Sequence, residues 1–545
     1  MKQHILEKAR HYGARTAIRS QGRQVSYDEL CAKAARLSQV LLLRNNLFSE
    51  SLNGQRVAYL LERSPSYVVT QWATWASGGI AVPLHPGLPT AELQYMIETS
   101  GASQIVTNRQ HLTAVEEACP QLPVELIEEV DADFSSSSLS SSSSLSYVSL
   151  DDLNPNNFAA DKPAQILFTS GTTGRAKGVV ATHQNITTQI NDIIQAWEIT
   201  PEDSILHFLP LHHVHGIINK LLVPLYAGGS VNMLPNSRPE LIWKHVRDHT
   251  TIIMAVPTIY ANLLEWYHQQ SPHEQAVARE NIQKLRLCVS GSMSCPLPIL
   301  HEWEKITGHS LLERYGMTEL GMVLTNPLHG TRYAGYVGQP FPSVRVKLGK
   351  STTPSESDED DIRTTTIATN PNQGELLVKG DTVFDSYWNR PDATRDAFDA
   401  DGWFRTGDWV EYCPAKHSYK ILGRMSSDIL KVGGYKISAV EIEATVLEVD
   451  DCVAECFVVG APDAKWGQTI VAVVRLKNQA ARNDDDETTK SQVEQDAQHS
   501  ILNYVTSKLA KYKIPRKFVF LDTIPKNAMG KVNKKKLLAE LQHRL

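Results

Sequence analysis

Small hydroxyl residues, three glycines and a lysine follow a short apolar run, Ile166–Phe168, that predicts a strand. Because glycine has no Cβ, several backbone N–H groups can converge on an anion, and a lysine adds a mobile positive charge. Gly178 follows Lys177 where a Walker A loop needs Ser or Thr. We interpret the segment as a different phosphate-binding loop and not as a flexible surface turn. Its members are Thr169, Ser170, Gly171, Thr172, Thr173, Gly174 and Lys177.

Three histidines, His212, His213 and His215, lie within four positions and could bind zinc. However, no fourth ligand lies at helical spacing, and Pro210 and Gly216 predict a turn. A metal site, structural histidines and a substrate pocket therefore stay open, and we favour the pocket.

Arg286 belongs to an apolar run that predicts a strand entering the turn Ser290-Gly291-Ser292. Arginine is rarely buried unless it is paired, and its planar guanidinium matches a carboxylate with two parallel hydrogen bonds. The residue therefore predicts either a site for an acidic substrate or a structural ion pair at a strand edge.

The bulk composition describes an ordinary globular chain of 545 residues, enough for about three or four folding units. A net charge of −6 gives no basic field that favours nucleic acid or anionic membrane. The seven cysteines include no CxxC pair, which indicates a reducing compartment. Neither a membrane-spanning run nor a signal-peptide core is present. We expect the protein to lie in the cytoplasm or in the matrix of an organelle, the mitochondrion or the peroxisome, and not to be secreted.

Strand-like and helix-like segments alternate in the first part of the chain. Ser26 and Glu29 have the spacing of a capping box before a helical run to Leu43. Strands are expected at 57–61, 80–82 and 104–106, with helices at 65–77 and 91–99 between them. This alternation predicts a parallel sheet covered by helices on both faces. Three biased segments, 131–149, 351–366 and 483–487, are expected to be surface insertions or linkers.

Several short motifs occur in one order along nearly the whole chain. Together they resemble the adenylate-forming superfamily, which comprises acyl-CoA synthetases, peptide adenylation domains and luciferases. The motifs are Thr169–Gly174 with Lys177-Gly178, Tyr315–Glu319, Trp403–Asp408, Gly423-Arg424, Gly433–Lys436 and Pro525–Lys531. Within the superfamily the chain is most similar to malonyl-CoA synthetases, through Ala255–Tyr260, Arg286–Ser292, His309–Glu319 and Trp466–Gln468.

The resemblance implies an α/β fold with a large N-terminal part of stacked sheets and flanking helices and a small mobile α+β domain. We expect residues 1–423 to bind ATP and the acid, and residues 424–545 to carry a catalytic lysine. It also implies a malonate–CoA ligase that uses ATP, Mg²⁺ and coenzyme A and passes through an acyl-adenylate. Its partners would be small molecules, with no nucleic acid, no membrane span and no obligate protein partner.

The roles of individual residues follow from the same resemblance. The glycine-rich loop would hold the β- and γ-phosphates, Thr318 and Glu319 would act at the α-phosphate, and Glu319 would bind magnesium. Asp408 would accept hydrogen bonds from the ribose hydroxyls, with Arg424 beside it. The remaining ATP-binding residues would be Ser290, Gly291, Ser292, Tyr315, Gly316 and Met317.

Lys531 would catalyse adenylation by bridging the attacking carboxylate and the phosphate. Domain rotation would then present the coenzyme A loop, formed by Gly433, Gly434, Tyr435 and Lys436. Two departures weaken the match: Ser426 replaces the usual Asp or Lys of the hinge, and Ala176 replaces the proline before the loop lysine.

A malonyl substrate brings a second carboxylate, which needs a paired cation if it is buried. The resemblance assigns that role to Arg286, with His213 as the neighbouring wall. The alternatives are a ligase for methylmalonate, for short or medium acyl groups or for aryl acids. An amino-acid adenylation domain and a nucleotide-binding regulator without catalysis are less compatible with the motifs.

Overall fold

Alternate side chains of the central strands enter different hydrophobic cores. Val57 and Tyr59 face one core and Ala58 and Leu60 another. Since successive side chains of a strand point to opposite faces, each large sheet is covered on both sides. The computed structural model describes residues 3–44, 51–128, 154–169, 175–349, 371–433, 435–449, 452–463, 465–477, 487–526 and 532–541.

The first large sheet has seven strands, and five successive strands that extend to one edge of the sheet are parallel. The other two strands pair antiparallel at one edge, where the phosphate loop begins and ends. In spatial order the strands are β18 (Ser386–Tyr387), β8 (Lys177–Thr182), β7 (Pro163–Thr169), β4 (Ile80–Pro83), β3 (Arg56–Leu60), β5 (Ala102–Thr107) and β6 (Val124–Leu126).

The second large sheet has nine strands, with antiparallel pairs at its two edges. Its central strands are parallel, so their carboxyl ends meet at one edge. In order they are β15 (Gln339–Pro340), β14 (Gly321–Thr325), β13 (Leu312–Met317), β12 (Leu287–Ser290), β11 (Ile252–Ala255), β9 (Ser204–His207), β10 (Ser230–Met233), β1 (Thr16–Ser20) and β2 (Arg23–Ser26).

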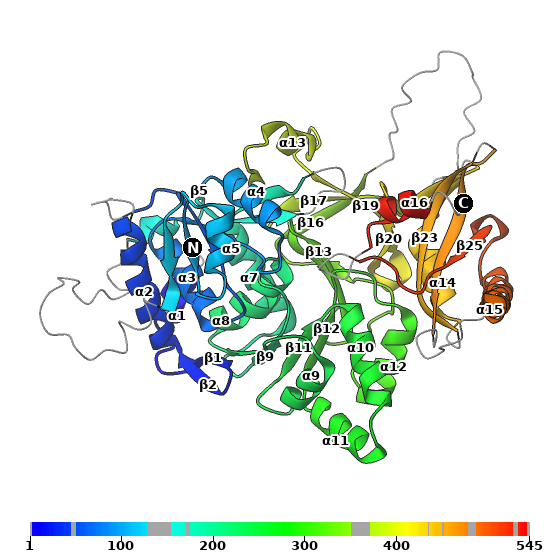
Figure 1. Ribbon diagram of the computed structural model, residues 1–545, viewed down its shortest axis with the longest axis horizontal. Helices are drawn as coiled ribbons and strands as arrows, with labels where there is room; N and C mark the ends of the chain where they lie inside the picture. Colours follow the sequence, from blue (N-terminus) through cyan, green and yellow to red (C-terminus); the bar gives the residue numbers. More distant parts are fainter. Residues whose placement is uncertain are drawn as a thin grey trace, which may run out of the picture.

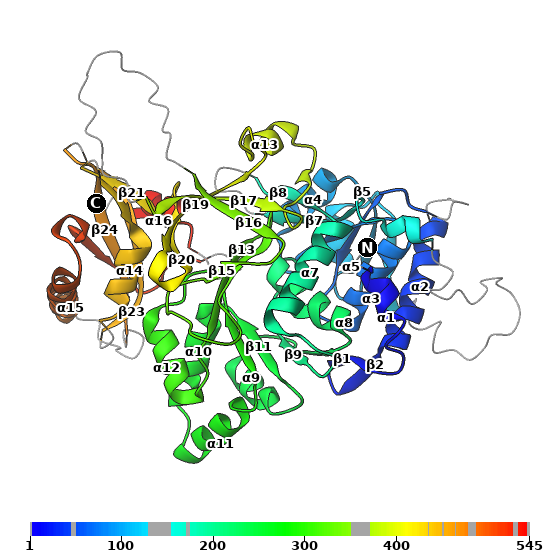
Figure 2. The ribbon, with the colours of Figure 1, turned by 180° about the vertical axis from the view of Figure 1, so that it is seen from behind.

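The helices form three layers, one between the two sheets and one on the outer face of each sheet. Figures 1 and 2 show two outer groups of helices on opposite sides of α7. The helices packed between the sheets are α1 (Ile5–Ala9), α2 (Tyr27–Arg44), α3 (Pro65–Ala76), α7 (His183–Trp197), the π-helix η3 (His215–Leu222) and α8 (Val223–Ala227). The outer groups are α4 (Thr90–Ser100) with α5 (Leu112–Ala118), and α9 (Pro239–Val246), α10 (Pro257–His268), α11 (Pro272–Ile282) and α12 (Leu297–Thr307).

Two smaller parts complete the chain. A four-stranded antiparallel sheet contains β16 (Val344–Gly349), β17 (Gln373–Gly380), β19 (Phe404–Cys413) and β20 (Ser418–Arg424), with α13 (Pro391–Asp396) between β18 and β19. The C-terminal elements, orange to red in Figure 1, lie at the end of the molecule opposite to α1 and α2. They are β21 (Ile429–Val432), β22 (Tyr435–Ser438), α14 (Ala439–Leu447), β23 (Val453–Asp463), β24 (Gly467–Leu476), α15 (Glu487–Lys508), β25 (Lys517–Phe520) and α16 (Lys534–Leu541).

The α/β class, the stacked sheets and the small α+β part are therefore confirmed. The backbone N–H of Glu29 donates to the hydroxyl of Ser26 at 3.1 Å, as the predicted capping box requires. Gly216 is an exception, because it lies within η3 and not in a turn. The segments 131–149 and 351–366, and 483–487 apart from Glu487, lie outside the described residues. In the described part of the chain, no helix is long and apolar enough to cross a membrane.

Two buried histidines make the fold sensitive to acid. Nε2 of His4 lies 3.0 Å from Nδ1 of His183, and the His4 ring stacks on Phe158. Burial lowers the pKa of His4 to about 3 and lowers the pKa of His183 well below its ordinary value. Below pH 6.5 the unfolded chain therefore binds protons that the folded chain does not bind.

We expect the free energy of unfolding to fall on acidification from pH 6.5, by about 1.4 kcal/mol per pH unit for each such histidine. His183→Gln removes one of them and should flatten the slope by about that amount between pH 5.5 and 4.5, where the unfolded histidine is almost fully protonated. Urea denaturation of both proteins at several pH values measures the slopes. Equal slopes would contradict the assignment of a neutral His183.

Candidate active site

The phosphate-loop residues lie at the edge hairpin of the first large sheet. Thr169 ends β7, Lys177 begins β8, and the two residues are paired in the strand register. Nζ of Lys177 lies 5.0 Å from the ring centroid of Tyr387. Residues 170–174, predicted as the rest of the loop, lie outside the described residues. The structure thus fixes the entry and exit of the loop.

Glu319 lies in the turn between β13 and β14, next to Thr318. Its side chain is 7 % exposed, and its Oε1 accepts a hydrogen bond of 2.8 Å from the hydroxyl of Tyr387. No lysine or arginine of the described chain forms an ion pair with it. A buried carboxylate beside neutral hydroxyls is an oxygen donor set that fits a hard divalent cation.

Tyr315, Asp408 and Arg424 converge although they come from distant segments. Asp408 on β19 pairs with Arg424 on β20, and Nε of Arg424 lies 3.1 Å from Oδ1 of Asp408. The hydroxyl of Tyr315 donates to the other carboxylate oxygen. Burial lowers the pKa of Arg424, but Asp408, Tyr315, Glu319 and Asp428 together raise it above its ordinary value. The arrangement provides an aromatic face next to an anchored, buried carboxylate.

The turn Ser290-Gly291-Ser292 follows the carboxyl end of β12, beside the antiparallel pair β13–β14. Gly291 leaves no room for a side chain, since a Cβ there would lie 2.5 Å from Nε of Arg314. Ser292 has a left-handed backbone with φ of 71°, and its Oγ lies 3.3 Å from Nδ1 of His215. Gly316 and Met317 continue β13 next to Tyr315.

Arg314 on β13 is the functional candidate that the sequence analysis missed. It is 4 % exposed, and its Nε and Nη2 donate to no acceptor in the part of the chain that is described. Burial lowers its pKa to about 9, so it is charged at neutral pH. Burial, followed by the positive field of Arg314, lowers the pKa of His215. A buried cation without an anion is costly, so this edge of the sheet fits an anionic ligand.

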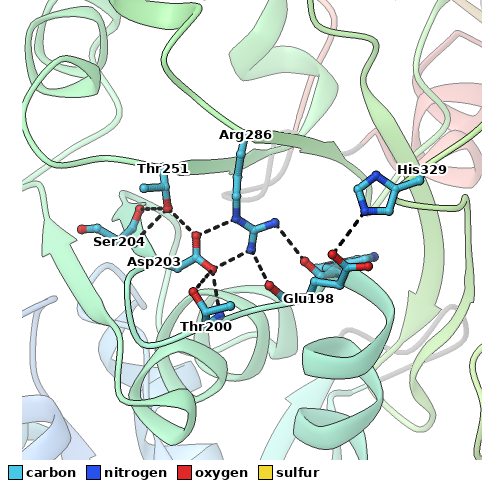
Figure 3. A network of polar contacts seen from close by, with 8 residues as sticks. Glu198, Thr200, Asp203, Ser204, Thr251, Arg286 and His329 are labelled. Atoms are coloured by element: carbon cyan, nitrogen blue, oxygen red, sulfur yellow. Dashed lines mark hydrogen bonds and ion pairs between the residues drawn. The ribbon is translucent and has the colours of Figure 1, made fainter.

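Arg286 does not lie at this edge of the sheet, which argues against its assignment to the acid. Its guanidinium donates from Nε and Nη2 to Asp203 at 2.7 and 2.6 Å, and to the carbonyl groups of Trp197 and Glu198. Figure 3 shows this fork facing Asp203, with Thr251 close by. Asp203, Thr251 and Arg286 directly precede three parallel strands, so they mark the amino edge of the sheet. Strand β12 lies between Arg286 and Gly291, and at about 3.3 Å per residue their Cα atoms are about 17 Å apart.

We expect Arg286→Leu to lower stability and leave acid preference unchanged. The substitution leaves the Asp203 carboxylate, whose side chain is 3 % exposed, without its cation. Removing one partner of such a pair costs about 2–4 kcal/mol in the free energy of unfolding. Urea denaturation measures the loss, and Arg286→Leu combined with Asp203→Asn should recover part of it. A selective loss of activity on dicarboxylates would restore the original assignment.

His213 lies next to His212, with the two ring centroids 3.9 Å apart. Its charge also contributes to the lowered pKa of the neighbouring His215. The placement is compatible with a pocket wall, and the role remains a prediction.

The predicted coenzyme A loop forms the hairpin of β21 and β22. Gly433 has φ of 56° and packs against Trp466, and the ring of Tyr435 is 53 % exposed and stacks on Tyr512. Gly434 and Lys531 lie outside the described residues, and only the backbone of Lys436 is described. The segments that flank Lys531 are anchored, because Lys526 pairs with Glu455 and Lys534 pairs with Asp428 and Glu443.

Comparisons with known proteins match both parts of the chain. Residues 5–388 match the model of the AMP-binding enzyme family, and residues 441–531 match its C-terminal domain. The mitochondrial malonate–CoA ligases ACSF3 of Xenopus laevis and Homo sapiens are each 38% identical over 98% of this chain and 91% of their own. ATP-bound MatB from Rhodopseudomonas palustris superimposes with a TM-score of 0.80 at 30% identity, covering 99% of both chains. The expected boundary after residue 423 falls between the two matched segments and stays a prediction.

Proposed function

This chain belongs to the AMP-binding enzymes, and from that membership we infer that it is an ATP-dependent malonate–CoA ligase. It is an acid–CoA ligase that forms AMP. The malonate–CoA ligase of Arabidopsis thaliana, 37% identical over 97% of this chain and 86% of its own, supports malonate as the acid. A related malonyl-CoA ligase structure contains methylmalonyl-CoA and AMP, which favours methylmalonate as a second substrate.

The observation that supports malonate is the buried guanidinium of Arg314, whose Nε and Nη2 have no acceptor among the described residues. It lies against Gly291 at the carboxyl edge of the sheet, where parallel α/β sheets bind ligands. A malonate bound with one carboxylate toward ATP would direct the other toward Nε and Nη2 of Arg314. A monocarboxylate would leave this cation without an anion. Ser292, His213 and His215 complete the proposed pocket.

In this proposal ATP binds between the side chains that converge around Tyr315. Tyr315 would lie on adenine, Asp408 would accept from the ribose hydroxyls, and Arg424 would orient Asp408. Lys177 and the loop from Thr169 would hold the terminal phosphates. A magnesium ion, held by Glu319 and the phosphate oxygens, would neutralise phosphate charge.

The reaction consists of two substitution steps, each with its own leaving group. A carboxylate oxygen of malonate forms a bond to the α-phosphorus, and pyrophosphate leaves. The sulfur of coenzyme A then forms a bond to the acyl carbon, the thiol proton is lost, and AMP leaves. Lys531 would stabilise charge in the first step. Rotation of residues 424–545 would bring the loop of Gly433, Gly434, Tyr435 and Lys436 to the site for the second step.

The names of the vertebrate relatives favour the mitochondrion as the compartment. Subcellular fractionation with an antibody against the chain tests this part of the proposal.

The proposed function is tested with the purified full chain, ATP, Mg²⁺ and coenzyme A. AMP release and the acyl-CoA product are measured with malonate, methylmalonate, acetate, butyrate, benzoate and a set of amino acids. We expect malonyl-CoA to form with the highest kcat/KM. Efficient turnover of monocarboxylates with no turnover of malonate would overturn the acid assignment, and AMP release without an acyl-CoA product would overturn the ligase.

A further inference from the structure

Tyr387 is fixed beside the phosphate loop by the backbone. It belongs to β18, which extends the first large sheet by pairing Tyr387 with Val179 of β8. The N–H of the next residue, Trp388, donates to the carbonyl of Gly178 at 2.8 Å. Since Gly178 directly follows Lys177, the position of Tyr387 relative to the loop lysine is set by strand pairing.

The side chain of Tyr387 contacts groups of opposite charge. Its hydroxyl donates to Oε1 of Glu319 at 2.8 Å, and Nζ of Lys177 lies 5.0 Å from its ring centroid, within the range of a cation–π interaction. The turn that carries Glu319 is tied to the same segment, because the N–H of Phe384 donates to the carbonyl of Glu319 at 2.7 Å. One phenol therefore connects the phosphate loop with the turn after β13.

The orientation of the ring is held from two further sides. Phe384 packs edge-on against it with centroids 4.7 Å apart, and the N–H of Tyr387 donates to the hydroxyl of Thr394 at 2.9 Å. A side chain locked by packing and backbone contacts is suited to holding other groups in place.

We propose that Tyr387 is a positioning residue that keeps Lys177 and Glu319 from neutralising each other. Lys177 and Glu319 contact the same phenol, opposite charges in a partly buried site attract strongly, and a direct ion pair would remove both from ligand binding. The phenol satisfies one oxygen of Glu319, and the ring offers Lys177 an alternative contact. The other carboxylate oxygen stays available for a divalent cation, and Lys177 stays available for phosphate. This inference rests on the roles given to Lys177 and Glu319 under the proposed function.

Tyr387→Phe tests the hydrogen bond, because it keeps the ring under Lys177. ATP binding without acid or coenzyme A is measured by calorimetry over a series of MgCl₂ concentrations. We expect the Mg²⁺ concentration for half-maximal enhancement of ATP binding to rise about tenfold, as for the loss of one hydrogen bond to a charged group. Binding of ATP in EDTA should not change.

Tyr95→Phe is the matched control. The hydroxyl of Tyr95 donates to the carbonyl of Ala176 at 3.0 Å, and its ring lies 5.2 Å from the guanidinium of Arg175. This variant also removes a phenol hydroxyl from the loop exit, but one without contact to Glu319. We expect its Mg²⁺ dependence to equal that of the parent. An equal shift in both variants would mean general loop damage and would overturn the proposal.

Tyr387→Leu tests the separation of the charges, since it removes both the hydroxyl and the ring. We expect ATP binding in EDTA to weaken about tenfold, because Lys177 then pairs with Glu319. Adding Glu319→Gln should restore that binding to the level of Tyr387→Phe. No restoration, or an unchanged Mg²⁺ dependence in Tyr387→Phe, overturns the positioning role. Circular dichroism of each variant excludes misfolding. If the parent protein forms malonyl-CoA, such a result leaves the proposed function intact, whereas an inactive parent refutes the proposed function itself.

Discussion

Lys531→Ala should abolish malonyl-adenylate formation and preserve thioester formation from supplied malonyl-adenylate. We expect the rate of the first half-reaction to fall on the order of 10²–10³-fold, because a positioned cation that stabilises developing charge is lost. Under the proposed function the second half-reaction uses the loop of residues 433–436, which lies elsewhere in the C-terminal part. Pyrophosphate release reports the first step, and malonyl-CoA formed from synthetic adenylate reports the second.

Lys536→Ala provides the matched control on the same lysine-rich tail. Lys536 is exposed and lies 3.8 Å from Glu540 within α16, so its removal changes the charge of the tail and little else. It should leave both half-reactions at the parent rate. Equal loss of both half-reactions in Lys531→Ala would contradict a role in adenylation alone. The anchoring of Lys526 and Lys534 on either side limits the effect of the substitution to the loop between them.

Arg314→Met should remove the preference for malonate. Methionine is similar in length and carries no charge, so the second carboxylate would be buried without a cation. Truncating one partner of a buried charge pair costs several kcal/mol, and kcat/KM for malonate should fall on the order of 10²–10³-fold. Butyrate, which places a methyl group there, should be used as well as or better than by the parent. Initial rates with both acids give the change in the ratio of kcat/KM for malonate to kcat/KM for butyrate.

Two measurements distinguish this effect from general damage. The KM for ATP should stay within about twofold of the parent value, because Arg314 does not belong to the residues around Asp408 that are proposed to bind adenosine. Arg286→Leu should leave the ratio of malonate to butyrate unchanged, although it destabilises the fold. An equal loss for both acids in Arg314→Met would contradict a specificity role.

The residues proposed to bind the nucleotide could be selected from the sequence because they lie in short motifs. Tyr315, Asp408 and Arg424 lie in separate motifs, and the structure brings them into direct contact. Local patterns also predicted α2, α3 and β3 to within one or two residues, since periodicity and capping are properties of neighbouring residues. The roles of these site residues remain proposals until they are tested.

The choice between two arginines could not be made from local pattern. Arg286 and Arg314 both lie next to buried strands, and either guanidinium could match a carboxylate. The structure separates them, since Arg286 precedes β12 at the amino edge and Arg314 lies beyond its carboxyl end. One signal was available, because ligands of parallel sheets bind at the carboxyl ends of strands. The partner of Arg286, Asp203, is 83 residues away, and no sequence pattern connects the two.

Tyr387 was missed for a similar reason. It belongs to a strand of two residues that pairs with β8 across about two hundred positions of sequence, and its neighbours carry no phosphate-binding pattern. Long-range pairing of so short a strand is decided by tertiary packing and not by local preference. Such a contact can be recognised only in the folded structure, in which the β7–β8 hairpin lies close to the turn after β13.

Strand β13 also has a consequence for altering the enzyme by design. Arg314 and Tyr315 are successive residues of this strand, and such neighbours project to opposite faces. Arg314 lies against Gly291 beside the proposed acid pocket, whereas the hydroxyl of Tyr315 reaches Asp408 at the proposed ribose position. Under the proposed function the strand therefore separates the acid from ATP. Libraries that vary residue 314 and the pocket wall around it can exchange the acid while the machinery for ATP is left as it is.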